Sequence, residues 1–189
     1  MRLIAFDMDG TLIPNTDSVT FLCRLSLADP AILDQINRQE ESGAVSWIEA
    51  DHARVRLIRD VSLDRVRETF DTHIRLIDGL SAVMDYLRQK DCRTMLITAG
   101  PRQVAEIIAE RYHFDDCFGS DFEVLDGAFT GRILSHIGLS GKSKYLAYVC
   151  RRENIPFKNC IAVGDSASDI DLFRQVGRSI AINYSMGLD

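Results

Sequence analysis

Short apolar runs, each followed at once by polar residues, most constrain how this chain can fold. The runs Arg2–Phe6, Arg93–Thr98 and Cys160–Gly164 are apolar and rich in strand-forming residues, and Ser179–Ile182 is a shorter run of the same kind. Runs like these are typical of strands that are buried on both faces. The sequence therefore predicts these segments as strands of a parallel sheet.

Helical periodicity lies between these runs. Apolar side chains recur at i, i+3, i+4 and i+7 from Leu80 and again from Val104, where Arg111 completes the stripe. Shorter stripes begin at Leu146 and Ile170. Strands that alternate with helices form parallel sheets with right-handed crossovers. We therefore expect an α/β fold, a Rossmann-like parallel sheet with helices on both faces.

One segment that departs from this alternation is residues 122–133. Asp126-Gly127 lies there between two short β-prone runs. An Asp-Gly pair in this context is a strong signal for a tight turn. The segment is therefore predicted to form a β-hairpin.

Residues 15–77 depart further, because they follow the first strand directly and contain no candidate strand. Ser46 and Glu49 have the spacing of a capping box, which predicts a helix through about Arg59. Ser62 can cap another helix, and Val19 begins a third apolar stripe. We expect a small helical cap at residues 15–77, inserted into an α/β core formed by residues 1–14 and 78–189.

Composition excludes several classes of function. The chain has 189 residues, with 22 Lys and Arg against 28 Asp and Glu, so its net charge is −6. This acidic balance argues against nucleic-acid binding, and no apolar run has the length of a membrane span. The five cysteines form no CxxC motif that would suggest zinc or a disulfide framework. Asp7 interrupts the first apolar run, so we expect no signal peptide and a cytoplasmic location.

Acidic and hydroxyl side chains follow the expected strands at their carboxyl ends. Ligands of open α/β sheets bind at this edge of the sheet, so we expect these side chains to meet there. They are Asp7, Asp9, Thr98, Asp165 and Asp169, with Lys142 at the start of the helix that precedes the third of these strands. Taken singly, each has an ordinary structural explanation, such as a turn, a helix cap or a surface lysine.

Such a constellation suits phosphoryl transfer. Clustered carboxylates repel one another unless a cation lies among them, and an all-oxygen ligand set suits Mg²⁺. A carboxylate beside this metal can attack phosphorus and form an aspartyl-phosphate. A second carboxyl group can protonate the leaving oxygen and then activate water. A lysine, a hydroxyl and free backbone N–H groups can neutralise the phosphoryl oxygens.

These motifs occur in this order in one known family of phosphatases, named below. The helical insert after the first motif resembles the C1 caps of this family. The stretches WIEADHARV and FEVLDGAFTGRI resemble its phosphoserine phosphatase-like subgroup. The chain is similar to phosphatases of the haloacid dehalogenase (HAD) superfamily in Asp7-Met8-Asp9-Gly10-Thr11, Thr98, Lys142, Gly164-Asp165 and Asp169. The resemblance implies a HAD core with a C1 cap.

The resemblance also implies roles for these residues. Asp7 is the nucleophile and a Mg²⁺ ligand, and Asp9 is the general acid and base, whose backbone carbonyl binds the metal. Thr98 hydrogen-bonds the phosphoryl group, and Lys142 neutralises the phosphate and the nucleophile. Asp165 ligates Mg²⁺. Asp169 supports the metal shell and Lys142. The substrate-binding positions around the phosphate are Gly10, Thr11, Ala99 and Gly100.

Arg54 matches the cap arginine that binds the substrate carboxylate in phosphoserine phosphatases. Its planar guanidinium can hold a carboxylate with two hydrogen bonds. The alternative is an i, i+3 ion pair with Asp51 on an exposed helix face. Trp47 lies seven residues earlier on the same helix, and we expect it in the apolar core of the cap.

The sequence differs from the phosphoserine phosphatase pattern at three places. Thr16, with Asp17 beside it, stands where those enzymes place a Glu. Ala99-Gly100 replaces a Gly-Gly pair, and Ser168 stands where an Asn is usual. These differences concern the choice of substrate rather than the chemistry.

We therefore expect a Mg²⁺-dependent phosphomonoester hydrolase that acts on a small phosphorylated metabolite, phosphoserine or a similar compound. The cap would close over the substrate and exclude water. Alternatives are a phosphomutase, a phospho-acceptor signalling module, and a non-catalytic binding protein on the same fold. Receiver domains of signalling proteins keep the acceptor Asp at the third strand and lack a cap of this size.

Overall fold

A computed structural model of the protein describes residues 1–138 and 141–183. Its strands form one sheet in the order β4-β3-β2-β1-β5-β6, parallel except for β4 against β3. The strands are β1 (Arg2–Phe6), β2 (Cys92–Pro101), β3 (Asp116–Leu125), β4 (Ala128–Ser135), β5 (Cys160–Gly164) and β6 (Arg178–Ala181). β1 and β5 have the expected bounds, β2 is longer at both ends, and β6 is shifted by one residue.

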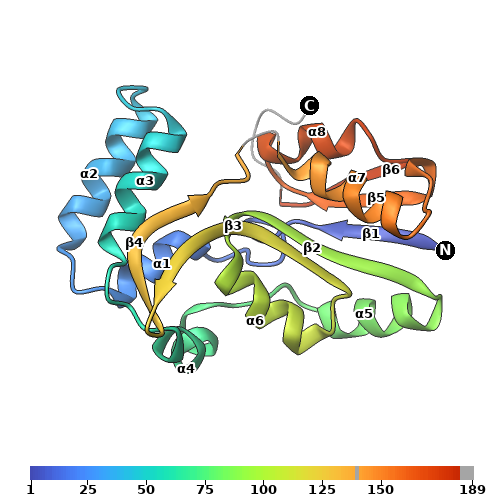
Figure 1. Ribbon diagram of the computed structural model, residues 1–189, viewed down its shortest axis with the longest axis horizontal. Helices are drawn as coiled ribbons and strands as arrows, with labels where there is room; N and C mark the ends of the chain where they lie inside the picture. The colour runs from blue at the N-terminus through green and yellow to red at the C-terminus, as the bar shows by residue number, and fades with distance from the viewer. Residues whose placement is uncertain (139–140, 184–189) are drawn as a thin grey trace.

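Helices cover both faces of this sheet, as expected (Figure 1). The α-helices of the described residues are α1 (Ser18–Leu25), α2 (Pro30–Glu41), α3 (Trp47–Leu57), α4 (Leu63–His73), α5 (Leu80–Gln89), α6 (Arg102–Tyr112), α7 (Lys142–Arg152) and α8 (Ile170–Phe173). Side chains alternate along a strand, so β1 places Ile4 and Phe6 in the core with α5 and α6. It places Leu3 and Ala5 in the core with α7 and α8.

The four apolar stripes of the core all fall on helices, α5 to α8. One member of a stripe departs from the expectation, because the side chain of Val83 is 45 % exposed. Leu80 and Met84 are buried on the same helix. The apolar face of α5 is therefore narrower than the periodicity predicts, and Val83 lies at its edge.

Residues 15–77 form α1 to α4 and no strand. The predicted capping box is present, with Ser46 as the N-cap of α3 and Glu49 returning to it. α2 was not predicted, although Asp29 at the N-cap and Pro30 at the first helical position are a recognised start signal. Only Ile36 of α2 is buried, so apolar periodicity gives little sign of this helix.

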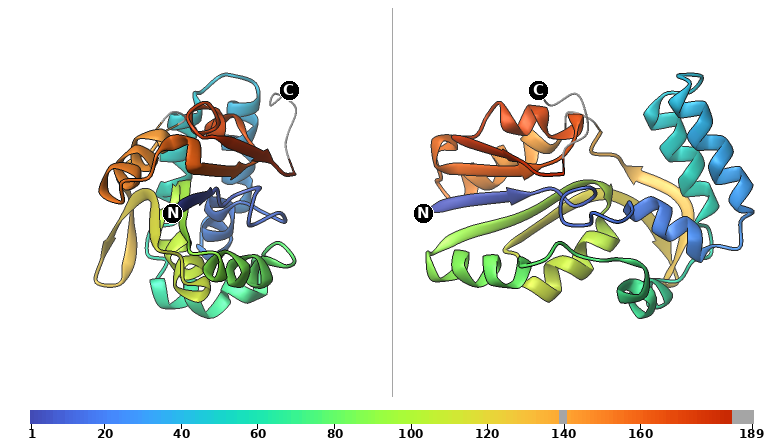
Figure 2. Two further views of the ribbon diagram at one scale, coloured as in Figure 1. Left: turned by 90° about the vertical axis from the view of Figure 1, so that its right-hand side faces the viewer. Right: turned by 180° about the vertical axis from the view of Figure 1, so that it is seen from behind.

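The two ends of this segment are tied together. The side-chain amide of Asn15 donates to the carbonyl of His73 at 2.9 Å, and the oxygen of that amide accepts from the backbone N–H of Arg75 at 3.0 Å. α2 and α3 lie side by side at one end of the molecule, beyond the carboxyl end of β1 (Figure 2). α4 packs elsewhere, against α1 and α6.

The predicted hairpin is present, but its first strand also belongs to the main sheet. Asp126 and Gly127 have φ of +51° and +79°, as a two-residue hairpin turn requires. Before the hairpin, β3 pairs in parallel with β2. This pairing was missed because Asp116 and Gly119 have low strand propensity, and neighbouring strands rather than local preference hold them there. β4 packs against α3, so the hairpin connects the sheet with the inserted helices through this contact.

Within residues 1–138 and 141–183, no helix combines the length and the apolar character needed to cross a membrane.

Candidate active site

Three of the predicted site residues lie where neighbouring strands end. Asp7 follows β1, Asp165 follows β5, and Thr98 lies near the end of β2. β1 is paired with both β2 and β5. The strand order therefore brings together side chains that are far apart in the sequence.

Lys142 joins this group from the first position of α7. Its side chain is completely buried, and Nζ donates to Oδ1 of Asp7 at 2.5 Å and to Oδ1 of Asp169 at 2.7 Å. A buried ammonium group needs such partners to offset the loss of its hydration. Lys142 thus fixes the positions of two carboxylates that come from different loops.

Burial and charge oppose each other at this ion pair. Burial raises the pKa of Asp7 above its usual value, while the charge of Lys142 acts to lower it. Burial acts to lower the pKa of Lys142, but Asp7 and Asp169 together raise it above its usual value. Because two carboxylates face the ammonium group, Lys142 stays protonated and favours the ionised form of Asp7.

Asp7, Asp165 and Asp169 place one oxygen each within 4.8 Å of one another. Thr11 Oγ1 donates to Asp165 Oδ1 at 3.0 Å and lies 3.3 Å from Asp7 Oδ2. Asp169 already has hydrogen-bond partners, since its Oδ2 accepts from the backbone N–H groups of Asp165 and Ser166. These all-oxygen donors fit Mg²⁺, with Asp7 and Asp165 as the candidate ligands and Asp169 in support.

Gly10 leaves room for this cluster. Its φ is +78°, a conformation that glycine adopts without strain. A Cβ atom at this position would lie 2.2 Å from Oδ2 of Asp165. The glycine of the first motif therefore allows the backbone to approach the carboxylate of the third strand end.

The carboxyl group of Asp9 lies outside that cluster and is held by Ser18, which the sequence analysis missed. The backbone N–H of Ser18 donates to Oδ1 at 2.8 Å, and its hydroxyl donates to Oδ2 at 2.6 Å. Burial raises the pKa of Asp9 to about 7, although the bonds from Ser18 act to lower it. Asp17 is the N-cap of α1, directly before Ser18, but no local pattern in the sequence indicated this contact.

Thr98 and Gly100 lie beside Asp9. The backbone N–H of Gly100 donates to Thr98 Oγ1 at 2.9 Å, which orients the hydroxyl. A Cβ atom at Gly100 would lie 2.7 Å from Asp9 Oδ2 and 2.6 Å from Ser18 Oγ. The end of β2 therefore needs a glycine at this position. Neighbouring Ala99 lines the same cavity as Asp9, Thr98 and Gly100.

A cavity of about 360 Å³ opens above these groups. The inserted helices supply one wall, including Asp17, Trp47, Asp51 and Arg54. The core supplies the rest: Asp7, Asp9, Thr98, Ala99, Gly100, Lys142, Ser166, Ala167 and Ser168. Trp47 was expected in the apolar core, but it is half-buried in this wall with its ring edge-on to His136, at 5.0 Å between ring centroids. Pockets of about 300–1,000 Å³ are typical of small-molecule sites.

Arg54 reaches the cavity wall but is not free. Its Nη1 lies 3.4 Å from Asp51 Oδ1, which is the i, i+3 pair considered as the alternative. Its Nε and Nη2 donate to Asn37 Oδ1 at 3.1 and 2.8 Å, and Nη2 also pairs with Glu40. The pair is largely buried between α2 and α3 rather than exposed.

The family model of haloacid dehalogenase-like hydrolases matches residues 4–174. The chain belongs to the haloacid dehalogenase-like hydrolase family. Its fold agrees, since it superimposes with a TM-score of 0.82 on a phosphoserine phosphatase holding an analogue of its phospho-aspartyl intermediate, at 24 % identity over 97 % of this chain and 87 % of that one. A substrate-bound phosphoserine phosphatase gives a TM-score of 0.83 at 23 % identity, over 98 % of this chain and 87 % of that one.

Curated relatives of this HAD protein include a phosphoserine phosphatase of Archaeoglobus fulgidus. It is 28 % identical over 186 residues, which are 96 % of this chain and 52 % of the relative. The phosphoserine phosphatase of Streptomyces coelicolor is 25 % identical over 96 % of this chain and 44 % of its own. The chain thus spans about half the length of these curated relatives.

Proposed function

We propose that this HAD protein is a Mg²⁺-dependent phosphomonoester hydrolase that acts on a small phosphorylated metabolite in the cytoplasm. The observation that carries the proposal is the buried contact of Lys142 with Asp7 and Asp169, next to an all-oxygen group of carboxylates at the base of a cavity. A lysine that neutralises a carboxylate nucleophile and an incoming phosphate fits phosphoryl transfer.

In this proposal Asp7 attacks phosphorus, and the bond from phosphorus to the leaving oxygen breaks to give an aspartyl-phosphate. Asp9 gives its proton to the leaving oxygen and then takes a proton from the water that hydrolyses the intermediate. Thr98 and Lys142 hold the phosphoryl oxygens. Asp7, Asp165 and the backbone carbonyl of Asp9 would hold Mg²⁺, which when bound neutralises charge on the phosphoryl group.

In this mechanism the inserted helices and the α/β core have different roles. We propose that residues 15–77 are a cap and that residues 1–14 and 78–189 are the catalytic core. The cavity lies between residues of both parts, so the cap is placed to exclude water and to contact the leaving group.

Substitution of the nucleophile tests the proposal. Asp7→Asn should lower Mg²⁺-dependent phosphate release by roughly 10³-fold or more, because an amide cannot form the aspartyl-phosphate. Phosphate release from a panel of phosphoserine, sugar phosphates and nucleotides, with circular dichroism to check folding, measures this. The matched control is Asp34→Asn, the same change at an exposed position of α2, which should retain activity.

Other outcomes would contradict the proposal in distinct ways. Near-wild-type turnover by folded Asp7→Asn protein would remove Asp7 from the mechanism. A second phosphosugar in place of free phosphate would indicate a phosphomutase. An aspartyl-phosphate that persists for minutes would indicate a signalling module.

A further inference from the structure

The guanidinium of Arg54 is already occupied. It has five N–H groups, and four contacts with Asn37, Glu40 and Asp51 involve all three of its nitrogens. Its side chain is only 13 % exposed. A substrate carboxylate would find no free pair of parallel N–H groups and would have to displace two carboxylates of the protein.

Charge on the same wall of the cavity is acidic. Asp51 and Asp17 both line the cavity, and Glu40, which does not, pairs with Arg54 as Asp51 does. Arg54 is thus shared between two carboxylates. His136 contacts Asp51 Oδ2 through Nε2 at 3.0 Å. Asp17 uses Oδ1 to cap the N–H of Thr20, which leaves its charge at the cavity without a basic partner among the described residues.

We infer that the leaving-group end of this cavity selects phosphate esters of alcohols that carry an ammonium group and no carboxylate. The inference rests on the proposed function and specifies its substrate class. Asp51 is the specificity-determining residue: its two oxygens contact Arg54 and His136, but it borders the cavity and shares the single charge of Arg54 with Glu40. Arg54 is a positioning residue that holds α2 against α3.

Electrostatics gives the direction of the selection. A carboxylate placed against this wall would face Asp17 and Asp51 at short range, with only the shared charge of Arg54 in return. An ammonium group would be attracted by the same two carboxylates.

Four esters of similar size test the inference on the wild-type protein. They are phosphoethanolamine, which carries an ammonium group; 2-hydroxyethyl phosphate, which is neutral; phosphoglycolate, which carries a carboxylate; and phosphoserine, which carries both charges. We expect kcat/KM to be highest for phosphoethanolamine, and to exceed that for phosphoglycolate by roughly 10- to 100-fold. A higher kcat/KM for any of the other three would overturn the inference.

Substitutions then assign the selection to residues. Asp51→Asn should reduce the ratio of kcat/KM between phosphoethanolamine and 2-hydroxyethyl phosphate by about tenfold, mainly through the KM of phosphoethanolamine. Asp34→Asn makes the same change on an exposed helix face and should keep the wild-type ratio. An unchanged ratio in folded Asp51→Asn protein would remove Asp51 from the selection.

Arg54→Gln separates the two roles of the arginine. If Arg54 only positions α2 and α3, the ratio of kcat/KM for phosphoglycolate or phosphoserine to that for phosphoethanolamine should stay the same or fall. If Arg54 binds carboxylates, those two substrates should lose kcat/KM selectively, which would contradict the inference. Failure of the inference is distinct from failure of the proposed function, because in the latter case neither these four esters nor the sugar phosphates and nucleotides of the wider panel would release phosphate.

Discussion

Ser18 shows how a single residue can position a reacting group without belonging to any motif. It is completely buried at the first position of α1, and both of its bonds reach the carboxyl group of Asp9. The backbone N–H donates to Oδ1 and the hydroxyl donates to Oδ2, so both oxygens of Asp9 have a partner on Ser18. Ser18 therefore orients Asp9 from the segment that we propose as the cap.

Replacement of Ser18 by alanine should lower kcat by roughly 10- to 100-fold, because a hydrogen bond to a charged group contributes about 1.5–3 kcal/mol. KM should change little, since Ser18 does not line the cavity. Steady-state kinetics with thermal melting measures both effects. Ser26→Ala, which removes a hydroxyl at the other end of α1, is the control and should retain kcat.

The pKa of Asp9, raised to about 7 by burial, predicts a pH dependence. Below this pH Asp9 holds the proton that an alkyl leaving group requires, and above it that proton is lost. We expect kcat/KM for an alkyl phosphate to fall as pH rises through about 7. Ser18→Ala should move the fall to higher pH, because the bonds from Ser18 act to lower the pKa of Asp9.

A pH–rate profile with an alkyl phosphate checks this, and nitrophenyl phosphate serves as a control. The nitrophenolate leaves without a proton, so its rate should fall much less in the same pH range. Equal falls for both esters would contradict a general-acid role for Asp9.

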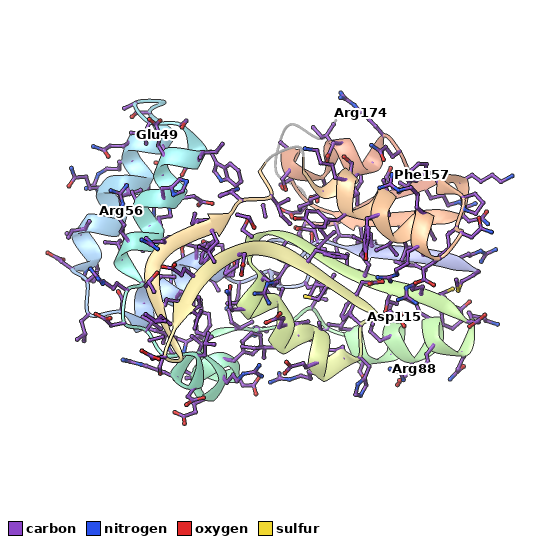
Figure 3. All side chains as sticks on the ribbon, viewed as in Figure 1. Glu49, Arg56, Arg88, Asp115, Phe157 and Arg174 are labelled. Atoms are coloured by element: carbon purple, nitrogen blue, oxygen red, sulfur yellow. The ribbon has the colours of Figure 1, made fainter. Side chains whose placement is uncertain are left out.

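Among the elements, α3 carries Trp47, Asp51 and Arg54 of the cavity wall and depends on its start signal. Ser46 Oγ accepts from the backbone N–H of Glu49 at 3.3 Å, and Glu49 Oε2 accepts from the backbone N–H of Ser46 at 2.8 Å. Glu49 lies at the exposed end of this helix (Figure 3). Trp47 and Asp51 follow within the first turns, so the N-terminal capping box of α3 fixes the position of these two cavity-lining residues.

Ser46→Ala should lower the free energy of unfolding by about 1 kcal/mol, because it leaves an orphan N–H in the first turn. Denaturant unfolding measures the change. Ser42→Ala, at the C-cap of α2, removes an exposed hydroxyl and should have a smaller effect. An equal effect in both variants would show that the capping box contributes nothing specific.

At the scale of the molecule, the inserted helices and the α/β core share one apolar core. Phe21 and Phe70 from the insert lie in the same buried cluster as Phe6 of β1 and Phe122 of β3. Phe70 packs edge-on to Phe21, and the guanidinium of Arg111 on α6 lies over its ring at 5.2 Å. α4 is therefore attached to the core, and the whole chain should unfold as one unit.

Phe70→Ala should lower the free energy of unfolding by about 3–5 kcal/mol while the thermal transition remains single. Calorimetry measures both properties. Phe157→Ala is the control, since this ring is 41 % exposed and lies far from the insert (Figure 3). Two separate transitions in the wild-type protein would contradict the shared core.

The sequence by itself determined the features that depend on neighbouring residues. The bounds of β1 and β5, the turn at Asp126-Gly127 and the capping box at Ser46 follow from local preferences, which the structure satisfies. The order of the acidic motifs also indicated which side chains would meet, because the carboxyl ends of parallel strands share one edge of the sheet.

Only the tertiary structure decided the contacts between segments with no shared local signal. Three contacts are of this kind. They are the parallel pairing of β3 with β2, the bonds from Ser18 to Asp9, and the contacts of Arg54 with Asn37 and Glu40. Each joins groups whose local preferences are compatible with several partners. Their partners are chosen when the packed core fixes where each strand and helix lies, because a buried polar group must then bond to whatever lies within reach.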